Sequence, residues 1–314
     1  MSEAHSAANR PLAAIALKVG SIAVFVGMQA FIKLAGIVPA GQIVFFRSFF
    51  AMVPILLLLA WTGEIRTAFH TQRPGRHIVR GIVGVSSMAL GFFALTRLPL
   101  PEAIVLNYAQ PLLVVVISAL VLGETVRIYR WTAVAVGFVG VLIISWPKLT
   151  LFGSPESLGS DEALGVVAAL AAAAISAVAI LQVRSLVATD RSSTIVIWFS
   201  LTSSVAGLLS MPFGWAPLSG WQVFVLVMAG ICGGVAQIMM TEAYRYASVS
   251  TVAPFEYSSI LFGLIVGYLL FADVPTAYTL VGGAIVVASG LFIIWREQRL
   301  GLERAKTPKV SPPQ

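Results

Sequence analysis

The sequence predicts an all-α integral membrane protein with ten transmembrane helices, arranged as two inverted five-helix repeats. Of its 314 residues 58% are hydrophobic and only 11% are charged, and the apolar residues fall into ten separate segments. A run of about 20 apolar residues spans the roughly 30 Å hydrocarbon layer as a helix, whose internal hydrogen bonds satisfy its backbone. Soluble domains of this length are far more polar.

An internal repeat with an offset of 149 residues predicts the inversion. The offset places Tyr108 on Tyr257, and it also superimposes Gly81 on Gly230, Gly84 on Gly233, Ala94 on Ala243 and Glu124 on Asp273. Because five crossings leave the chain on the other side of the membrane, the second copy must enter the bilayer upside down. Many secondary transporters are built in this way.

The ten segments are bounded by charged and turn-forming residues. They are expected at Ala13–Leu34, Ala40–Trp61, His77–Ala94, Leu100–Leu122 and Trp131–Trp146, and then at Ala163–Leu186, Thr194–Pro212, Trp221–Ala243, Val249–Phe271 and Ala277–Trp295. This division gives a tail over residues 1–12, a first repeat over 13–146, a polar periplasmic linker over 147–162 and a second repeat over 163–295. The basic tail over 296–314 is predicted to be disordered.

The basic residues predict the orientation. If the N-terminus is cytoplasmic, 16 of the 20 lysines and arginines lie in cytoplasmic loops or at cytoplasmic segment ends, and Lys33, Arg97 and Lys148 lie on the opposite side. The positive-inside rule then places both termini in the cytoplasm. Because these residues are spread over short loops, no nucleic-acid partner is expected. The first apolar run exceeds a signal-peptide core and is interpreted as the first crossing.

Two ionisable residues fall well inside the segments, where a charge costs about 2.5 to 3.5 kcal/mol on insertion scales and usually faces a cavity or a partner. Arg47 is expected to contact substrate or to order an aqueous vestibule; the alternative is that it ties helix ends together through backbone carbonyls. Glu256 is the proton-coupling candidate, because a desolvated carboxylic acid can bind and release a proton; alternatively, it bonds a neighbouring helix. Lys18, Lys33 and Arg80 lie near segment ends, where long side chains can reach the interface, and are expected to be structural residues.

Amide and aromatic residues inside the segments are the candidate lining of a central cavity. Together with the two charged residues, they give a predicted substrate-binding set of Gln29, Arg47, Asn107, Tyr108, Gln110, Trp198, Gln237, Glu256 and Tyr257. Aromatic faces stack on a flat ring while amides bond its edge, so this lining suits a flavin, an aromatic amino acid or a purine. The alternative is that the amides bond across helix interfaces. Pro111 and Pro254 should break two central helices, as at a carrier's binding site.

Catalytic function classes find little support. The three histidines, His5, His70 and His77, lie in the tail and around one loop, and Cys232 is the single cysteine. No metal site, no cofactor and no enzyme activity is therefore expected. The chain has no Gly-rich phosphate loop for ATP. A membrane transferase would need paired acids at one membrane face, while a channel remains an alternative to a carrier.

The stretch Val44 to Phe50, the turn Leu122-Gly123-Glu124 and the following Gly137 and Gly140 resemble the EamA family of the drug/metabolite transporter superfamily. The resemblance covers nearly the whole chain and implies a ten-helix carrier of small metabolites in the bacterial inner membrane. Stretches at Ala16 to Val19, Val44 to Phe50 and Leu98 to Glu102 are similar to bacterial riboflavin importers, which implies riboflavin uptake. Export of amino acids or other small metabolites is the alternative. The second turn has Ala272 and Asp273, a departure from the family pattern.

Overall fold

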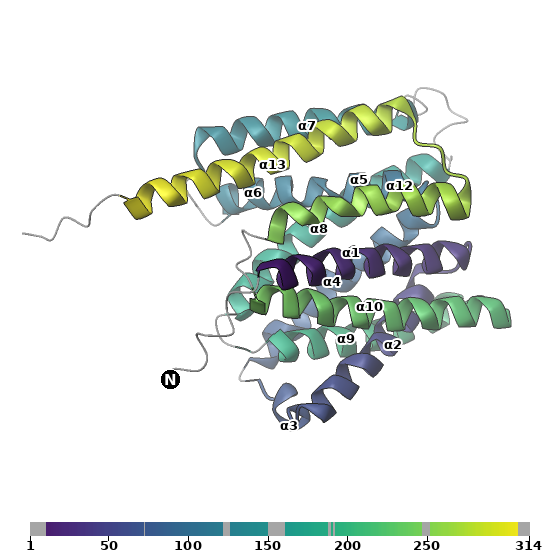
Figure 1. Cartoon of the computed structure of the whole chain (residues 1–314). Coiled ribbons are helices and arrows are strands. Elements are labelled where there is room, and N and C mark those ends of the chain that lie inside the picture. Colours follow the sequence, from purple (N-terminus) through teal and green to yellow (C-terminus); the bar gives the residue numbers. More distant parts are fainter. Residues whose placement is uncertain are drawn as a thin grey trace, which may run out of the picture.

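The computed structural model describes residues 11–71, 73–121, 126–149, 161–187, 190, 192–246 and 252–306, and this part of the chain contains helices and turns but no strands. The first repeat consists of α1 (Pro11–Leu34), α2 (Ala40–Trp61), the short α3 (Ile65–Ala68), α4 (Pro74–Leu95), α5 (Leu100–Asn107), α6 (Ala109–Val121) and α7 (Ile128–Leu149) (Figure 1). The second consists of α8 (Asp161–Val187), α9 (Ser192–Leu209), the 3-10 turn η3 (Met211–Phe213), α10 (Gly220–Tyr246), the 3-10 turn η4 (Ala253–Tyr257), α12 (Ser258–Phe271) and α13 (Ala277–Lys306).

These helices provide the predicted crossings. Nine spans in the described ranges are long and apolar enough to cross a membrane, with α5 and α6 forming one span and η4 and α12 another. The remaining apolar helix is shorter, at Ser193–Leu209 within α9. The all-α, ten-helix membrane architecture is therefore confirmed.

The helix ends differ from the sequence prediction in one important place. Helix α13 continues beyond Trp295 to Lys306, so the prediction of a disordered tail from Arg296 is wrong over 296–306. The added residues are mainly Arg, Glu, Gln, Leu and Lys, which are good helix formers and can therefore continue the helix after the hydrophobic run has ended. Most of the predicted linker and the turn Leu122-Gly123-Glu124 lie outside the described residues.

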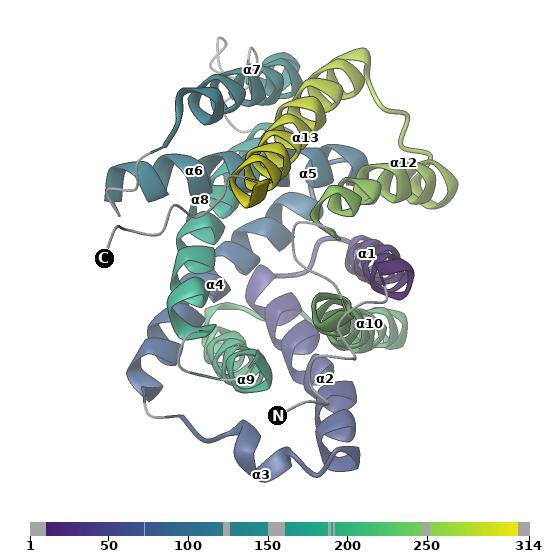
Figure 2. The same ribbon diagram turned by 60° about the vertical axis from the view of Figure 1, so that its left-hand side comes forward.

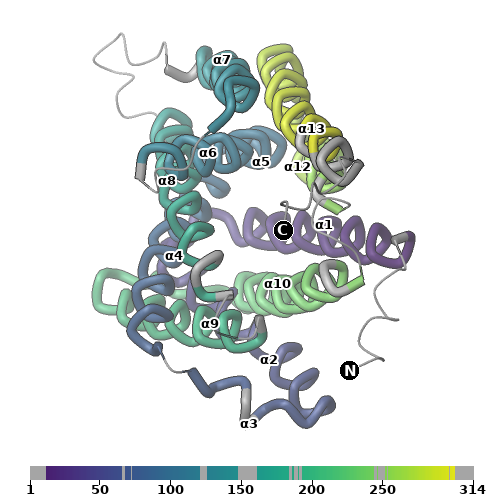
Figure 3. Tube along the Cα trace, turned by 90° about the vertical axis from the view of Figure 1, so that its left-hand side faces the viewer, coloured from purple at the N-terminus to yellow at the C-terminus, as the bar shows by residue number. Residues whose placement is uncertain are grey.

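The helix contacts follow the internal repeat. Helix α2 packs against α9 and α7 against α13, so each of these helices contacts its own repeat equivalent. Helix α1 packs against α10, and in the equivalent exchange α8 packs against α4. A two-fold axis between inverted copies produces both kinds of contact: helices on the axis contact their own equivalents, and each contact between non-equivalent helices occurs twice. Helices α7 and α13 lie at one edge of the molecule, and α2, α3 and α9 lie towards the opposite edge (Figures 2 and 3).

The buried core is concentrated at one end of the helices. We call the side where α1 begins the N-terminal face, on the left of Figure 1, and the side where α7 ends and α8 begins the linker face. The largest apolar cluster comes from the ends of α1 and α4 and the beginnings of α2, α5 and α10, and includes Ile32, Ile43, Leu95, Leu100 and Leu226. All of these positions lie towards the linker face, which is therefore tightly packed.

Candidate functional site

A cavity of about 650 Å³ lies where the two repeats meet. Its described lining comes from α1, α4, α5, α6, α8, η4, α12 and α13. Most of these residues are apolar, and the polar ones are Gln29, Ser87, Asn107, Tyr108, Gln110, Glu256, Tyr257 and Ser259. A mostly apolar cavity of several hundred Å³ with a few converging polar groups is typical of a small-molecule site.

Broken helices bring the polar groups to the cavity. Helix α5 ends at Asn107 and α6 begins at Ala109, so the backbone is irregular at Tyr108. Pro111 has no N–H to donate to the carbonyl of Asn107, which accounts for the break at this point. In the second repeat, the 3-10 turn η4 contains Pro254 and runs to Tyr257, where α12 follows. The two repeats are therefore irregular at equivalent positions.

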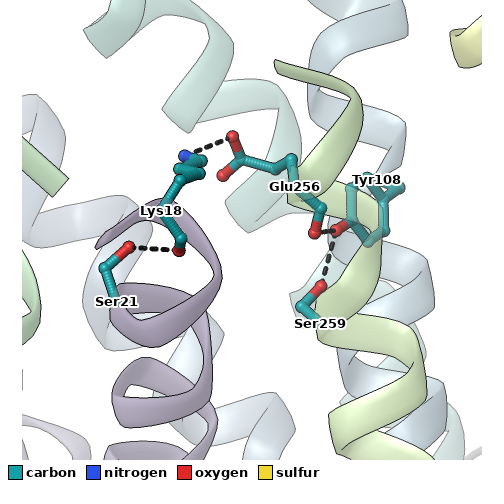
Figure 4. Close-up of polar contacts among 5 residues, drawn as sticks. All are labelled: Lys18, Ser21, Tyr108, Glu256 and Ser259. Carbon is teal, nitrogen blue, oxygen red and sulfur yellow. Dashed lines mark hydrogen bonds and ion pairs between the residues drawn. The ribbon is translucent and has the colours of Figure 1, made fainter. Parts of the chain in front are cut away.

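The equivalent tyrosines meet in the cavity. The rings of Tyr108 and Tyr257 stack with centroids 4.9 Å apart and an interplanar angle of 22°. The Tyr108 hydroxyl donates to the backbone carbonyl of Glu256 over 2.6 Å (Figure 4). The hydroxyl oxygen of Tyr108 also lies 2.5 Å from the Ser259 hydroxyl. Because the Tyr108 proton is used in the first bond, Ser259 is the donor in the second. These contacts join α5 of the first repeat to η4 and α12 of the second.

Glu256 pairs with Lys18 of α1. The Nζ atom of Lys18 lies 2.8 Å from Oε2 of Glu256 (Figure 4). The Lys18 side chain is 0% exposed and the Glu256 side chain is 50% exposed. The prediction that Lys18 reaches the membrane interface is therefore wrong. A carboxylate from η4 gives the buried ammonium the charged partner that such a position requires.

A second ion pair ties three helix ends together at the linker face. Lys33 Nζ lies 2.7 Å from Asp273 Oδ2 and donates to the Leu98 carbonyl over 3.1 Å. The same carboxylate oxygen accepts the Leu100 backbone N–H over 3.0 Å. We call this group of four residues the linker-face clasp. It gives a structural role to Asp273, at the position where the sequence departs from the family pattern.

The two predicted arginines lie apart from the described cavity lining. Arg47 packs near Gly233 of α10, and its Nε atom is buried without a hydrogen-bond partner. Arg80 stacks over the Phe199 ring at 3.9 Å, with Nε and Nη1 also buried and without partners. The prediction that Arg80 reaches the interface is wrong, because its guanidinium turns inward and packs against the aromatic ring of α9.

The cavity brings together seven of the eleven predicted positions. Those that line it are Gln29, Asn107, Tyr108, Gln110, Pro111, Glu256 and Tyr257, whereas Arg47, Trp198, Gln237 and Pro254 are not among the described lining residues. Trp198 instead donates from Nε1 to the Phe69 carbonyl over 3.3 Å. Sequence reasoning missed Ser259, although the 149-residue offset makes it the equivalent of Gln110. Within the described ranges, no group of three His, Cys, Asp or Glu residues could hold a metal ion.

Comparison with known proteins gives the family. The model of the EamA-like transporter family matches residues 12–146 and 163–295. The chain belongs to this family. A solved crystal structure also has the fold, with a TM-score of 0.63 at 18% identity over 91% of this chain and 98% of the other.

The relatives of this chain are named as transporters of several different small molecules. A riboflavin transporter of Vibrio cholerae is 31% identical, over 81% of this chain and 83% of the relative. A pseudopaline exporter of Pseudomonas aeruginosa is 30% identical, over 83% and 89%. An S-adenosylmethionine uptake transporter of Rickettsia felis is 25% identical, over 82% and 84%. The protein is thus a multi-pass membrane transporter of a small molecule and not an enzyme.

Proposed function

We propose that the protein is an alternating-access secondary carrier of the bacterial inner membrane that takes up riboflavin. The observation that carries the proposal is the stacked pair of Tyr108 and Tyr257 in a cavity that also contains Gln29, Asn107 and Gln110. A flat ring system can stack on an aromatic face while amides bond the carbonyl and N–H groups at its edge. Riboflavin transporters of Vibrio cholerae and Rhizobium johnstonii are among the relatives, at 31% and 29% identity.

Alternating access is supported by the unequal packing of the two faces. The apolar cluster around Leu100 and the linker-face clasp lie between the cavity and the linker face. On the other side, the lining extends along α8 to Ile180 and along α13 to Ile294, towards the N-terminal face. If both termini are cytoplasmic, as the positive-inside rule predicts, this arrangement is an inward-open state.

Glu256 is the proposed proton-coupling residue. A proton on this carboxylate would remove the charge that attracts Lys18, and would thereby loosen η4 from α1. In vesicles that carry the protein, uptake of riboflavin should then depend on an imposed proton gradient. A Glu256→Gln variant should still exchange riboflavin down its concentration gradient but should not respond to the proton gradient. An equal response in both proteins would remove Glu256 from this role.

The direct test is counterflow of labelled riboflavin in proteoliposomes. A carrier preloaded with unlabelled riboflavin accumulates label transiently, whereas a channel does not. Stacking is worth about 0.5 to 1.5 kcal/mol beyond area burial, so Tyr108→Ala should weaken riboflavin binding by roughly twofold to tenfold. Gly27→Ala is the matched control, because a Cβ there meets nothing within 4 Å. Absence of counterflow with riboflavin would overturn the flavin assignment.

Export of an amino acid or another small metabolite is the second candidate. The pseudopaline exporter, 30% identical to this chain, favours it. The fold permits both directions, because the ion gradient and not the helix arrangement sets net flow. Cells that produce the protein and lose a metabolite from the cytoplasm faster than control cells would support export. Proteoliposomes that exchange labelled amino acids but not riboflavin would favour the same conclusion.

A further inference from the structure

We infer that the cavity is a charge filter: Glu256 presents a negative group to the solute, so that neutral and cationic substrates enter and anionic ones are rejected. The inference deepens the proposed function and rests on it only for the choice of riboflavin as substrate. Its basis is the unequal exposure of one ion pair. Glu256 is half-exposed and lines the cavity, while the Lys18 ammonium is wholly buried.

The order of the two charges gives the cavity its polarity. A solute meets the Glu256 carboxylate first, and the neutralising ammonium lies 2.8 Å from Oε2, out of contact with solvent. Figure 4 shows Lys18 on α1 and Glu256 reaching towards it from η4. The pair therefore acts on the cavity as a dipole with its negative end directed at the solute.

The positions that are equivalent to this ion pair in the internal repeat carry no charge. The repeat equivalent of Glu256 is Asn107, which also lines the cavity but is neutral. The equivalent of Lys18 is Val167, which is 48% exposed on the outside of α8. Among the described lining residues, the negative group therefore comes from the second repeat, and the two halves of the cavity differ in charge.

The size of the effect follows from Coulomb's law. In a partly dehydrated cavity, an anionic group placed near a carboxylate is repelled more strongly than the ammonium behind it can offset. We expect discrimination of at least about tenfold at low ionic strength, which salt should reduce. Riboflavin, which is uncharged, should be accepted, and riboflavin 5′-phosphate, which adds two negative charges to the same ring, should be rejected.

The filter can be measured without knowledge of the substrate. An Asn107→Cys substitution in a Cys232→Ser background places one thiol in the cavity, since Cys232 is the single native cysteine. Purified protein is then treated with trimethylammonium-ethyl or sulfonatoethyl methanethiosulfonate, and each rate is divided by that of a free thiol. The cationic reagent should react at least about tenfold faster than the anionic one. The ratio should fall towards one as ionic strength rises from about 10 mM to about 1 M.

Removal of the charges provides the matched comparison. Glu256→Gln removes the negative charge but keeps the Lys18 ammonium and should therefore reverse the preference, whereas the double variant Lys18→Met/Glu256→Gln should bring the ratio close to one. Size-exclusion chromatography checks that each variant is folded, and the salt series needs only the single-thiol parent, in which both charges are intact. Equal rates for the two reagents in the parent, or a ratio that neither salt nor the double variant changes, would overturn the inference.

A binding comparison separates this inference from the proposed function. Quenching of flavin fluorescence should show tight binding of riboflavin and binding of riboflavin 5′-phosphate at least about tenfold weaker. In the double variant Lys18→Met/Glu256→Gln the difference in affinity between the two flavins should be smaller, because the phosphate no longer meets a carboxylate. Equal binding of both flavins would overturn the charge filter alone. A normal reagent ratio without riboflavin binding would overturn the flavin assignment alone.

Discussion

The residues of the Lys18–Glu256 pair have unequal surroundings, and removal of each should therefore have a different cost. Lys18 is 0% exposed, so Glu256→Gln would leave a buried ammonium without its carboxylate. Removing one partner of a fully buried pair typically costs about 3 to 5 kcal/mol, and the half-exposed Glu256 should bring the cost here below that range. Lys18→Met leaves a half-exposed carboxylate that cavity water can solvate, so its cost should be smaller. Thermal unfolding in detergent should rank Glu256→Gln below Lys18→Met, with the double variant recovering much of the loss.

Tyr108 supports the site through its hydroxyl as well as its ring. Tyr108→Phe keeps the stack on Tyr257 but removes the contacts to the Glu256 carbonyl and to Ser259. At about 1 kcal/mol per hydrogen bond, the unfolding temperature should fall measurably. Tyr268→Phe is the matched control, because Tyr268 is 63% exposed on the outside of α12. An equal effect of both substitutions would contradict a specific role for the Tyr108 hydroxyl.

Individual site residues were partly predictable from the sequence. The repeat identified Asn107, Tyr108, Glu256 and Tyr257, because equivalent residues of inverted copies meet near their shared axis. The partner of Glu256 was not predictable, since Lys18 is 238 residues away in sequence and comes from another helix. Hydropathy gives the depth of a side chain in the membrane but not the neighbour it faces. For the same reason, Arg80 was expected at the interface and lies against Phe199.

At the scale of the elements, the predicted helix ends and breaks agree with the structure where proline or a turn interrupts the backbone hydrogen bonds. Helix α2 has the predicted bounds Ala40–Trp61, and the fourth segment is interrupted three residues before Pro111. The predicted end of the tenth segment at Trp295 is wrong, because α13 continues to Lys306 although the hydrophobic run ends at Trp295. Hydropathy indicates where a segment leaves the membrane, but it does not indicate where the helix ends. Charged residues such as Arg, Lys and Glu have high helix propensity, so a helix can continue through them.

Close packing of α7 against α13 gives a prediction for these elements. A Cβ on Gly140 would lie 2.7 Å from the Gly282 carbonyl oxygen, and this backbone atom cannot move aside without shifting the helix. Gly140→Ala should therefore destabilise the protein by about 1 to 3 kcal/mol, as overpacking typically does. Gly27→Ala, with open space around its Cβ, should cause no loss. Thermal unfolding of the two variants in the same detergent checks the contrast, and equal stability would contradict it.

At the scale of the whole molecule, the two faces differ in how they can be closed. The linker-face clasp joins Lys33 and Asp273 through opposite charges. Their repeat equivalents are Gln182 and Glu124, which offer an amide and a carboxylate. An ammonium–carboxylate contact has two charged partners, whereas an amide–carboxylate contact has only one. From the sequence, a contact between these equivalents would hold one charge where the linker-face clasp holds two, so we expect the state closed at the linker face to be favoured without substrate.

Weakening the clasp should therefore open the linker face. Asp273→Asn removes the charge that holds Lys33 and weakens the acceptor for the Leu100 N–H. A cysteine at Ala103 in the Cys232→Ser background should then react several-fold faster with a membrane-impermeant maleimide applied from the linker face. Asp161→Asn is the matched control at the same face: it breaks the 3.4 Å pair with Arg97, in which Asp161 is 67% exposed and which should contribute little. If both variants label at the rate of the parent, the clasp does not hold the linker face closed, and the packed cluster around Leu100 must do so by itself.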